Sequence, residues 1–334
     1  MTRPGRPLLE AVGLTKRFAA PSGLFGPRRQ VHAVESVSFS LAKGEVLGLV
    51  GESGSGKTTV GRMIMGLEQP TEGTILFDER EIGGGTRAEL LSVRRRIQMV
   101  FQDPFASLNP RRRVGDLIAE GLEIQRIGTR AEQRAEVSRL LDLVGLPSDA
   151  ANRFPHEFSG GQRQRIGIAR ALAVKPDVLV ADEPVSALDV SVQAQVLNLL
   201  QDLKEKLDLT ILFISHDLAV VEHFCDRVAV MYLGRLMELA PRETLFAQPR
   251  HPYTEALLSA APIPDPAQRR ERIVMQGDVP SPIDPPSGCV LRTRCRYALP
   301  ACAAAVPPLA EAGPGHFKAC IRDDILPRPV HALQ

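Results

Sequence analysis

Residues 51–58 read Gly-Glu-Ser-Gly-Ser-Gly-Lys-Thr, which fits the phosphate-binding pattern G-x-x-x-x-G-K-[ST]. An apolar run typical of a buried strand, residues 46–50, precedes this stretch, and a helix-like run, residues 60–65, follows it. A strand, a glycine loop and a helix start in this order let backbone N–H groups turn inward around phosphate oxygens. We therefore expect a nucleotide phosphate site here, because an accidental glycine turn would not need these flanks.

Each residue type in this loop has a predicted role. The glycines bare the N–H groups of the cradle, Lys57 can reach the β- and γ-phosphates, and the Thr58 hydroxyl can ligate Mg²⁺. The residues expected to contact the nucleotide are Gly51, Ser53, Gly54, Ser55, Gly56, Lys57, Thr58 and Thr59. Many motors, switches and pumps share such a loop, so the rest of the chain must indicate the function.

An acidic pair closes the short apolar run at residues 178–181. A carboxylate at the C-terminal end of a buried parallel strand points into the ligand crevice of an α/β sheet. Asp182 would hold Mg²⁺, directly or through water, and Glu183 would polarise the attacking water as a general base. Alone, these residues would equally fit a solvated acidic turn, and the phosphate loop favours the catalytic interpretation.

Two further stretches have both an ordinary and a functional interpretation. Ser159-Gly160-Gly161-Gln162 opens a helix expected over residues 162–174, where Ser159 can cap and the glycines bare N–H groups at a positive helix end. This is either an ordinary N-cap or a second anion site. His216 follows a buried strand expected at 210–214, and it is either a structural residue or a partner of the γ-phosphate.

Composition limits the classes of function. The 334 residues are enough for about two domains, and 41 basic against 39 acidic residues leave a net charge of +2. This balance argues against a nucleic-acid partner, so we expect the arginine runs at 94–96 and 111–113 to be solvated faces. The sequence has no apolar run near the ~20 residues of a membrane helix, and the first seven residues have no apolar signal region. We therefore expect a soluble cytoplasmic protein.

The order of strand and helix signals predicts an α/β fold. Residues 8–18 and 31–50 alternate apolar and polar positions, as in an antiparallel sheet. After residue 73, short strands precede a basic helix that we expect to end in residues 97–101. Residues from about 103 to 165 have helical spacing and no strand signals, which indicates an inserted helical subdomain. Short apolar strands alternate with helices thereafter, which is typical of a parallel sheet.

The motifs together resemble those of the nucleotide-binding subunit of an ABC transporter, over roughly residues 8–240. Besides the phosphate loop and the acidic pair, the resemblance rests on Phe101-Gln102-Asp103-Pro104, the Ser159–Gln162 signature, Ser186-Ala187-Leu188-Asp189 and His216, in the family order. It implies an ABC-type P-loop NTPase with a RecA-like parallel sheet, an antiparallel β subdomain and a helical subdomain. It also implies ATP as the nucleotide and ATP hydrolysis as the activity.

The resemblance assigns roles to three further residues. Gln102 senses the γ-phosphate and Mg²⁺ and links to the membrane subunits, so it counts among both the catalytic and the metal-binding residues. Asp189 lies across the dimer seam. An aromatic residue near the first strand stacks on adenine, and Phe18 is the candidate here.

The resemblance also implies partners. Two such subunits face head to tail, so that ATP lies between one phosphate loop and the signature of the other. The membrane-spanning permeases would be two separate chains, and the ATPase would lie peripherally on the cytoplasmic face of the membrane. An extracytoplasmic solute-binding protein would act through the complex.

Three stretches narrow the branch to the oligopeptide/dipeptide importers, which also include nickel uptake systems. They are residues 155–159 (Pro-His-Glu-Phe-Ser), 22–26 (Ser-Gly-Leu-Phe-Gly) and 251–259 (His-Pro-Tyr-Thr-Glu-Ala-Leu-Leu-Ser). Within this branch the chain is most similar to the F-type ATPase, which usually pairs with a homologous D-type partner, so a heterodimer or a homodimer is expected. A soluble non-transport ABC ATPase, a nickel importer and an exporter ATPase are the alternatives.

The last fifty residues are rich in cysteine and proline, which marks a C-terminal extension. We divide the chain into a nucleotide-binding domain, residues 8–245, and this extension, residues 246–334. Its cysteines are spaced C-x5-C-x6-C-x17-C, at Cys289, Cys295, Cys302 and Cys320.

Several interpretations of these four thiols compete. Disulfides suit secreted modules and not a cytoplasmic ATPase, whereas zinc sites usually show paired short spacings. A [4Fe–4S] cluster tolerates irregular loops, and it would staple a segment with little core. Unliganded thiols are the remaining alternative. Cys225, alone in the main body, is expected to be an inert buried residue.

Overall fold

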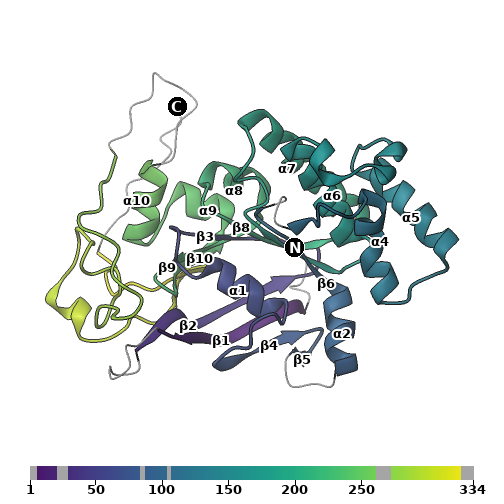
Figure 1. The fold of residues 1–334 in the computed structure, drawn as a ribbon. Coiled ribbons are helices and arrows are strands. Elements are labelled where there is room, and N and C mark those ends of the chain that lie inside the picture. Colours follow the sequence, from purple (N-terminus) through teal and green to yellow (C-terminus); the bar gives the residue numbers. More distant parts are fainter. Residues whose placement is uncertain (1–5, 21–28, 83–86, 104–106, 261–271, 325–334) are drawn as a thin grey trace. The chain divides into compact units, whose positions relative to one another are not determined.

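The computed structural model divides the chain into two compact units. Figure 1 labels their helices and strands. The structure describes residues 6–20, 29–82, 87–103, 107–260 and 272–324, so the branch stretch 22–26 and Pro104 lie outside the described residues. The "loop unit" consists of Leu8–Ser40, Val46–Glu81 and Ser215–Gln334, and the "helical unit" of Met1–Pro7, Leu41–Glu45 and Ile82–Ile214. The loop unit contains the phosphate loop, and the helical unit contains the acidic pair.

An antiparallel sheet in the loop unit has the strand order β2-β1-β4-β5. Its strands are β1 (Pro7–Ala19), β2 (Gln30–Ala42), β4 (Glu72–Phe77) and β5 (Arg80–Ile82). Leu9 faces Phe77 and Ala11 faces Ile75 across the β1–β4 pair. All four of these side chains are buried, because alternate residues of a strand point to the same face of the sheet. The antiparallel sheet expected at the N-terminus is confirmed for residues 8–18 and 31–42, whereas residues 46–50 form a strand of the second sheet.

The second sheet of the loop unit connects the phosphate loop to the C-terminal extension. Its strands, in spatial order, are β11 (Ala310–Gly313), β12 (His316–Lys318), β10 (Arg235–Pro241), β9 (Arg227–Tyr232) and β3 (Val46–Val50). The helical segments of the unit are α1 (Lys57–Ile64), α8 (Leu218–Phe224), α9 (Arg242–Ala247), α10 (Pro252–Ala260) and η3 (Pro300–Ala303). β3 pairs in parallel with β9, while the β11–β12 hairpin adds to β10 in antiparallel pairing.

The helical unit contains a parallel sheet with the order β8-β7-β6. These strands are β6 (Ile97–Val100), β7 (Val178–Asp182) and β8 (Thr210–Ser215). Its helical segments are α2 (Arg87–Arg96), α4 (Val114–Ile124), α5 (Arg130–Leu143), η1 (Ser148–Asn152), η2 (Pro155–Glu157), α6 (Gly160–Leu172) and α7 (Val190–Leu207). Helices and turns alone fill the described residues between 107 and 165, as expected for the helical insertion.

The structure also corrects the end of the expected basic helix. The basic helix does not continue to residue 101: α2 ends at Arg96, and Ile97–Val100 form strand β6. Ile97 pairs with Val178, and Val100 pairs with Ala181. The prediction was wrong because a short apolar run fits a buried helix and a buried strand equally well, and only pairing with β7 decides between them.

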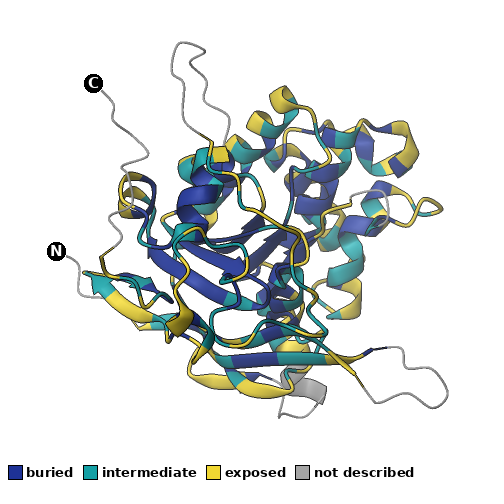
Figure 2. Ribbon diagram, turned by 90° about the vertical axis from the view of Figure 1, so that its left-hand side faces the viewer, coloured by how far each residue is buried: buried dark blue, intermediate teal, exposed yellow. Residues whose placement is uncertain are grey.

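Burial follows the parallel strands (Figure 2). Every residue of β3, β7 and β8 is buried, whereas β1 and β2 alternate between buried and exposed positions. Strands covered on both faces need continuous apolar runs, which is the pattern of these segments. Cys225 is fully buried beside Gly48 of β3, where its Sγ lies 2.9 Å from the position a Cβ would take, so the expectation of a buried residue is confirmed. Arg94, Arg95, Arg111 and Arg113 are exposed, as expected for solvated runs.

Candidate functional site

The phosphate loop connects β3 to α1 and encloses the ammonium group of Lys57. Lys57 Nζ donates to the carbonyl oxygens of Gly51 at 2.8 Å and Glu52 at 3.0 Å, and to Ser55 Oγ at 3.3 Å. The side chains of Lys57 and Ser55 are buried. The loop is therefore curled around a positive charge, as a phosphate-binding loop requires.

Two glycines of the loop cannot be replaced without distortion. Gly51 has φ +152°, and a Cβ there would lie 2.1 Å from the carbonyl oxygen of Met231. Gly56 has φ +100°, and its Cβ would lie 2.3 Å from the carbonyl oxygen of Ala33. Gly56 is also the N-cap of α1 and carries no side chain, so the first N–H groups of this helix are left to a ligand.

The acidic pair stands where β7 ends in the helical unit. Asp182 is the last residue of the strand and is buried. Glu183 has φ +46°, a left-handed conformation that costs a non-glycine residue about 1–2 kcal/mol. Its N–H donates to the carbonyl oxygen of Ile214 at 2.9 Å, and its carbonyl oxygen accepts the Ser186 hydroxyl at 3.1 Å. The backbone around Glu183 is thus held in a strained turn, as is common at functional sites.

Gln102 and Glu183 are brought together in the helical unit. Gln102 Nε2 donates to Glu183 Oε2 at 2.9 Å, although 81 residues separate the two. Gln102 lies two residues after the end of β6, and Glu183 directly follows β7, which pairs with β6. The parallel pairing therefore delivers both side chains to the same edge of this sheet.

The Ser159–Gln162 signature forms the N-terminus of α6. Ser159 Oγ accepts the Gln162 N–H at 3.3 Å, and Gln162 Oε1 accepts the Ser159 N–H at 3.0 Å, which is a reciprocal capping box. The helix begins at Gly160, two residues earlier than expected. Both capping side chains are exposed, so this helix end faces solvent within the described chain.

Asp189 forms a second exposed helix cap. Its Oδ1 accepts the Val192 N–H at 3.0 Å and the Ser191 hydroxyl at 2.7 Å. These hydrogen bonds, first that from Ser191, lower the pKa of the Asp189 carboxyl. Asp189 is therefore a charged cap at the start of α7.

The loop unit contains the two remaining candidates. His216 is exposed and follows directly after β8. Phe18 lies near the end of β1 and is 36% exposed, and the Lys16 ammonium lies 4.9 Å from its ring centroid. The ring is available for stacking, but it already has a cation on it.

The four C-terminal cysteines gather in the loop unit as free thiols. The Cys289 N–H donates to the Cys302 carbonyl oxygen at 2.8 Å. Burial first, and then the neighbouring thiols of Cys289, Cys320 and Cys302, raise the pKa of the Cys295 thiol to about 11. Among the described residues, no three His, Cys, Asp or Glu side chains are arranged to hold a single metal ion.

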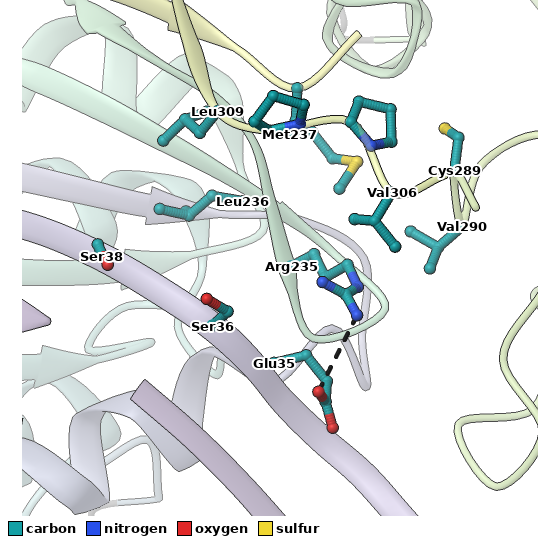
Figure 3. A pocket seen from close by; sticks show the side chains of 13 residues that line it. Glu35, Ser36, Ser38, Arg235, Leu236, Met237, Cys289, Val290, Val306 and Leu309 are labelled. Atoms are coloured by element: carbon teal, nitrogen blue, oxygen red, sulfur yellow. Dashed lines mark ion pairs between the residues drawn. The ribbon is translucent and has the colours of Figure 1, made fainter. Parts of the chain in front are cut away.

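A cavity of about 330 Å³ lies next to this cysteine group (Figure 3). Leu236, Met237 and Val306 contribute apolar wall, and the Cys289 thiol also lines it. At the polar end, Glu35 lies 4.0 Å from an Arg235 nitrogen.

The negative charge of Glu35 in this cavity is balanced by Arg17 and His32. Burial opposes its charge, but hydrogen bonds from Arg17 and His32 outweigh burial and lower the pKa of the Glu35 carboxyl. The Glu35 carboxylate of the cavity therefore already has basic partners within the protein.

Sequence reasoning missed a group of residues that contact the phosphate loop from the C-terminal extension. Tyr253 of α10 accepts the Glu52 N–H at 3.0 Å, and Arg294 donates to Glu52 Oε2 at 3.0 Å. Tyr253 lies in the stretch 251–259 that indicates the branch, but nothing local in the sequence connects this stretch to a loop 201 residues earlier.

Comparison with known proteins identifies the family. A model described as ABC transporter matches residues 34–186, and one described as oligopeptide/dipeptide transporter, C-terminal region, matches residues 237–302. A Brucella ovis protein named for peptide import and ATP binding is 59% identical over 96% of this chain and 99% of its own length. The oligopeptide transport ATP-binding protein AppF of Bacillus subtilis is 54% identical over 94% of this chain and 96% of its own.

Solved structures agree with these matches. cbiO1 from Clostridium perfringens, part of the ABC transporter complex cbiONQ, is 29% identical with a TM-score of 0.62, covering 72% of this chain and 90% of cbiO1. A dimeric ATP-binding cassette bound to ADP and Pi is 29% identical with a TM-score of 0.63, covering 70% of this chain and 98% of its own. Fold and phosphate loop thus define an ABC-type ATPase. The chain belongs to the ATP-binding proteins of ABC transporters.

In the described part of the chain, no helix is both long and apolar enough to cross a bilayer.

Proposed function

We propose that this ATPase powers the import of dipeptides or oligopeptides across the cytoplasmic membrane. The observation that carries the proposal is that one chain combines a preformed phosphate loop with an oligopeptide/dipeptide C-terminal region at residues 237–302. The relatives named for peptide import match this chain over more than nine-tenths of its length, which supports the same role.

The proposed hydrolytic step divides the chemistry among a few side chains. Gly51 and the loop residues from Ser53 to Thr59 bind the phosphates, and Lys57 places its charge on the β- and γ-phosphates. Thr58, Gln102 and Asp182 supply the oxygen ligands that Mg²⁺ prefers, and bound Mg²⁺ would neutralise charge developing on the phosphates.

Three further side chains have proposed roles in ATP binding or hydrolysis. Glu183 takes a proton from the attacking water as the general base, and the hydrogen bond from Gln102 orients its carboxylate. His216 donates a hydrogen bond to the γ-phosphate, and Phe18 stacks on adenine.

We propose that the exposed caps act on a second ATPase subunit. At the N-terminus of α6, Ser159 and Gln162 are exposed, Gly160 is partly exposed and Gly161 is buried, and Asp189 caps α7 at an exposed position. A helix N-terminus with bared N–H groups suits the γ-phosphate of ATP held by a facing subunit. Closure on ATP and opening after hydrolysis would then drive the transporter.

The proposal implies several partners. The ATPase would lie on the cytoplasmic face of the membrane against two transmembrane permeases, with a homologous ATPase as its dimer partner. An extracytoplasmic solute-binding protein would deliver the peptide to this complex. A nucleic-acid partner is not part of the proposal, because the net charge is only +2.

We also propose that the C-terminal thiols hold a [4Fe–4S] cluster. Thiols that raise one another's pKa lose protons with difficulty, and an iron cluster offsets the negative charge of four thiolates. A single zinc ion needs all four sulfurs about 2.3 Å from one point, which the described side chains do not offer. A cluster binds each thiolate to a different iron and tolerates wider spacing. Iron and sulfide analysis after anaerobic purification tests this, and colourless, iron-free protein would contradict it.

Uptake and hydrolysis measured together test the transport function. We expect ATP-dependent accumulation of labelled di- and oligopeptides in vesicles that contain the chain with its permeases, binding protein and partner ATPase. The matched control is Glu183→Gln, which keeps the side chain's size and should lower phosphate release about 100-fold or more. Uptake of nickel and not of peptides would correct the solute. Co-purification with ribosomal or nucleic-acid partners and no permease would overturn the proposal.

A further inference from the structure

We infer that Arg294 of the C-terminal extension is a positioning residue for ATP, because it holds Glu52 and thereby the phosphate loop. The inference rests on the proposed function only in taking ATP as the ligand of the loop. It adds a role for the extension in nucleotide affinity.

The extension contacts Glu52 at two atoms. Arg294 NH1 donates to Glu52 Oε2 at 3.0 Å, and Tyr253 Oη accepts the Glu52 N–H at 3.0 Å. All three residues belong to the loop unit. A side chain from the cysteine-rich segment and one from α10 therefore converge on the second residue of the loop.

Glu52 makes a third contact, with Lys57 of the phosphate loop. The carbonyl oxygen of Glu52 accepts Lys57 Nζ at 3.0 Å. Glu52 is thus hydrogen-bonded to three residues: its carboxylate to Arg294, its N–H to Tyr253 and its carbonyl oxygen to Lys57. A displacement of Glu52 changes where the Lys57 ammonium lies, and small displacements matter because phosphate recognition depends on a preorganised cradle.

The environment of Arg294 strengthens this pair. Its side chain is 10% exposed, and that of Glu52 is 28% exposed, so water screens the charges only in part. Arg294 also donates to the Tyr232 hydroxyl at 3.4 Å and, through Nε, to the carbonyl oxygen of Gly277 at 3.2 Å. The guanidinium is therefore held in one orientation by three different acceptors.

Two buried tyrosine rings pack beside the Arg294–Glu52 pair. Tyr232 is 1% exposed and Tyr253 is 0% exposed, and their ring centroids lie 4.8 Å apart with planes tilted by 55°. The Arg294 guanidinium carbon lies 5.9 Å from the Tyr232 ring centroid. Rigid side chains packed in this way fix Glu52 more firmly than a mobile surface ion pair would.

A purely structural role is the competing explanation, in which Arg294 only anchors the extension. The two explanations differ in nucleotide affinity. If Arg294 is only an anchor, its removal lowers the melting temperature but leaves the affinity of the phosphate loop for ATP unchanged. If Arg294 positions Glu52, its removal weakens ATP binding in protein that is still folded.

The test uses the full-length protein, four single variants and one double variant. Arg294→Met removes the charge at similar length, Arg294→Lys keeps the charge without the planar fork, and Glu52→Gln removes the partner charge. Arg292→Ala is the matched control, because Arg292 lies in the same turn and donates to the Ser287 carbonyl oxygen at 2.8 Å. The measurements are the dissociation constant of a fluorescent ATP analogue, KM and kcat for ATP, and the melting temperature.

We expect Arg294→Met to raise the dissociation constant and KM about three- to tenfold, with a smaller change in kcat. Arg294→Lys should restore part of the affinity, and Arg292→Ala should match the wild type. Arg294→Met combined with Glu52→Gln should weaken binding no more than either alone, since both remove the same contact.

Wild-type nucleotide affinity in Arg294→Met would overturn the inference, whatever its melting temperature. If Arg294→Met does not fold, wild-type affinity in Glu52→Gln would overturn it equally. Wild-type protein that binds ATP but does not hydrolyse it would contradict the proposed activity and leave the affinity comparison decisive for Arg294.

Discussion

Single residues of the phosphate loop are constrained by backbone geometry. Gly56 and Gly54 both have positive φ, at +100° and +78°. A Cβ on Gly56 would collide with the carbonyl oxygen of Ala33, whereas a Cβ on Gly54 would have no atom within 4 Å. Alanine at Gly54 would therefore introduce only conformational strain, whereas alanine at Gly56 would introduce strain and a steric collision.

We expect Gly56→Ala to be much more damaging than Gly54→Ala in the absence of nucleotide. Strain alone should lower the free energy of unfolding of Gly54→Ala by about 1–2 kcal/mol. The collision in Gly56→Ala should add about 1–3 kcal/mol and displace α1. Urea unfolding of both variants checks this, and equal losses would show that the loop relaxes around the added methyl group.

His251 should make stability depend on pH. Burial, together with the charge of Lys318, lowers its pKa to about 3, although a hydrogen bond to the Ala319 backbone opposes this shift. Its Nδ1 accepts the Tyr253 N–H at 3.1 Å, so the folded protein holds the neutral ring. The unfolded chain, with the ordinary pKa near 6.5, takes up the proton first.

The stabilisation from neutral His251 is complete above about pH 6.5 and is lost as the pH falls towards the folded-state pKa. We expect His251→Asn, whose amide oxygen can accept the same N–H, to reduce the slope of unfolding free energy by up to about 1.4 kcal/mol per pH unit between pH 6 and 4. Urea unfolding at several pH values measures the slope. His223→Asn, at an exposed position of α8, should keep the wild-type slope. An unchanged slope in His251→Asn would contradict the prediction.

At the scale of elements, close packing of α6 and α7 depends on one glycine. A Cβ on Gly161 of α6 would lie 2.3 Å from Val192 Cγ1 of α7. This contact places the signature helix directly against the helix capped by Asp189. The signature glycine therefore serves packing as well as its expected role at the nucleotide.

We expect Gly161→Ala to lower the free energy of unfolding by about 1–3 kcal/mol, because the added methyl group overpacks the α6–α7 contact. Val192→Ala should restore most of this loss in the double variant, since it removes the colliding methyl group. Thermal unfolding of the two single variants and the double variant measures the coupling. Additive losses would show that the contact does not limit packing.

The C-terminal hairpin is another element held by one buried group. Glu238 of β10 is 0% exposed, and it accepts the N–H groups of Arg250 at 2.6 Å and His251 at 3.1 Å. Its Oε1 also lies 2.6 Å from His316 Nε2 on β12. One carboxylate therefore joins the β10 strand, the start of α10 and the hairpin, which explains how a proline-rich segment is fixed to the sheet.

At the scale of the whole molecule, ATP should control dimerisation. In the proposed dimer, the exposed caps at Ser159 and Asp189 would face a second subunit, and trapped ATP should hold the two subunits together. We expect Glu183→Gln with ATP and Mg²⁺ to dimerise, with itself or with the homologous ATPase, as measured by light scattering. Adding Ser159→Arg should abolish the dimer by steric and charge conflict, whereas Arg126→Ala, at an exposed position of the α4–α5 turn, should not. Dimers that persist with Ser159→Arg would contradict the proposed contact.

The sequence by itself determined the parts whose geometry is local. The phosphate loop, the cap at Ser159 and the acidic end of β7 depend on a few consecutive backbone conformations, so short motifs specify them. The antiparallel strands and the helical insertion could also be predicted from the sequence, because the spacing of apolar residues reflects which positions are buried.

Only the tertiary structure decided the parts that depend on distant partners. Ile97–Val100 became a strand through pairing with β7, and Glu52 met Arg294 across 242 residues. The gathering of the four cysteines and the burial of Glu238 have the same origin. Such contacts are set by packing and by the closure of long loops, which no local pattern in the chain encodes.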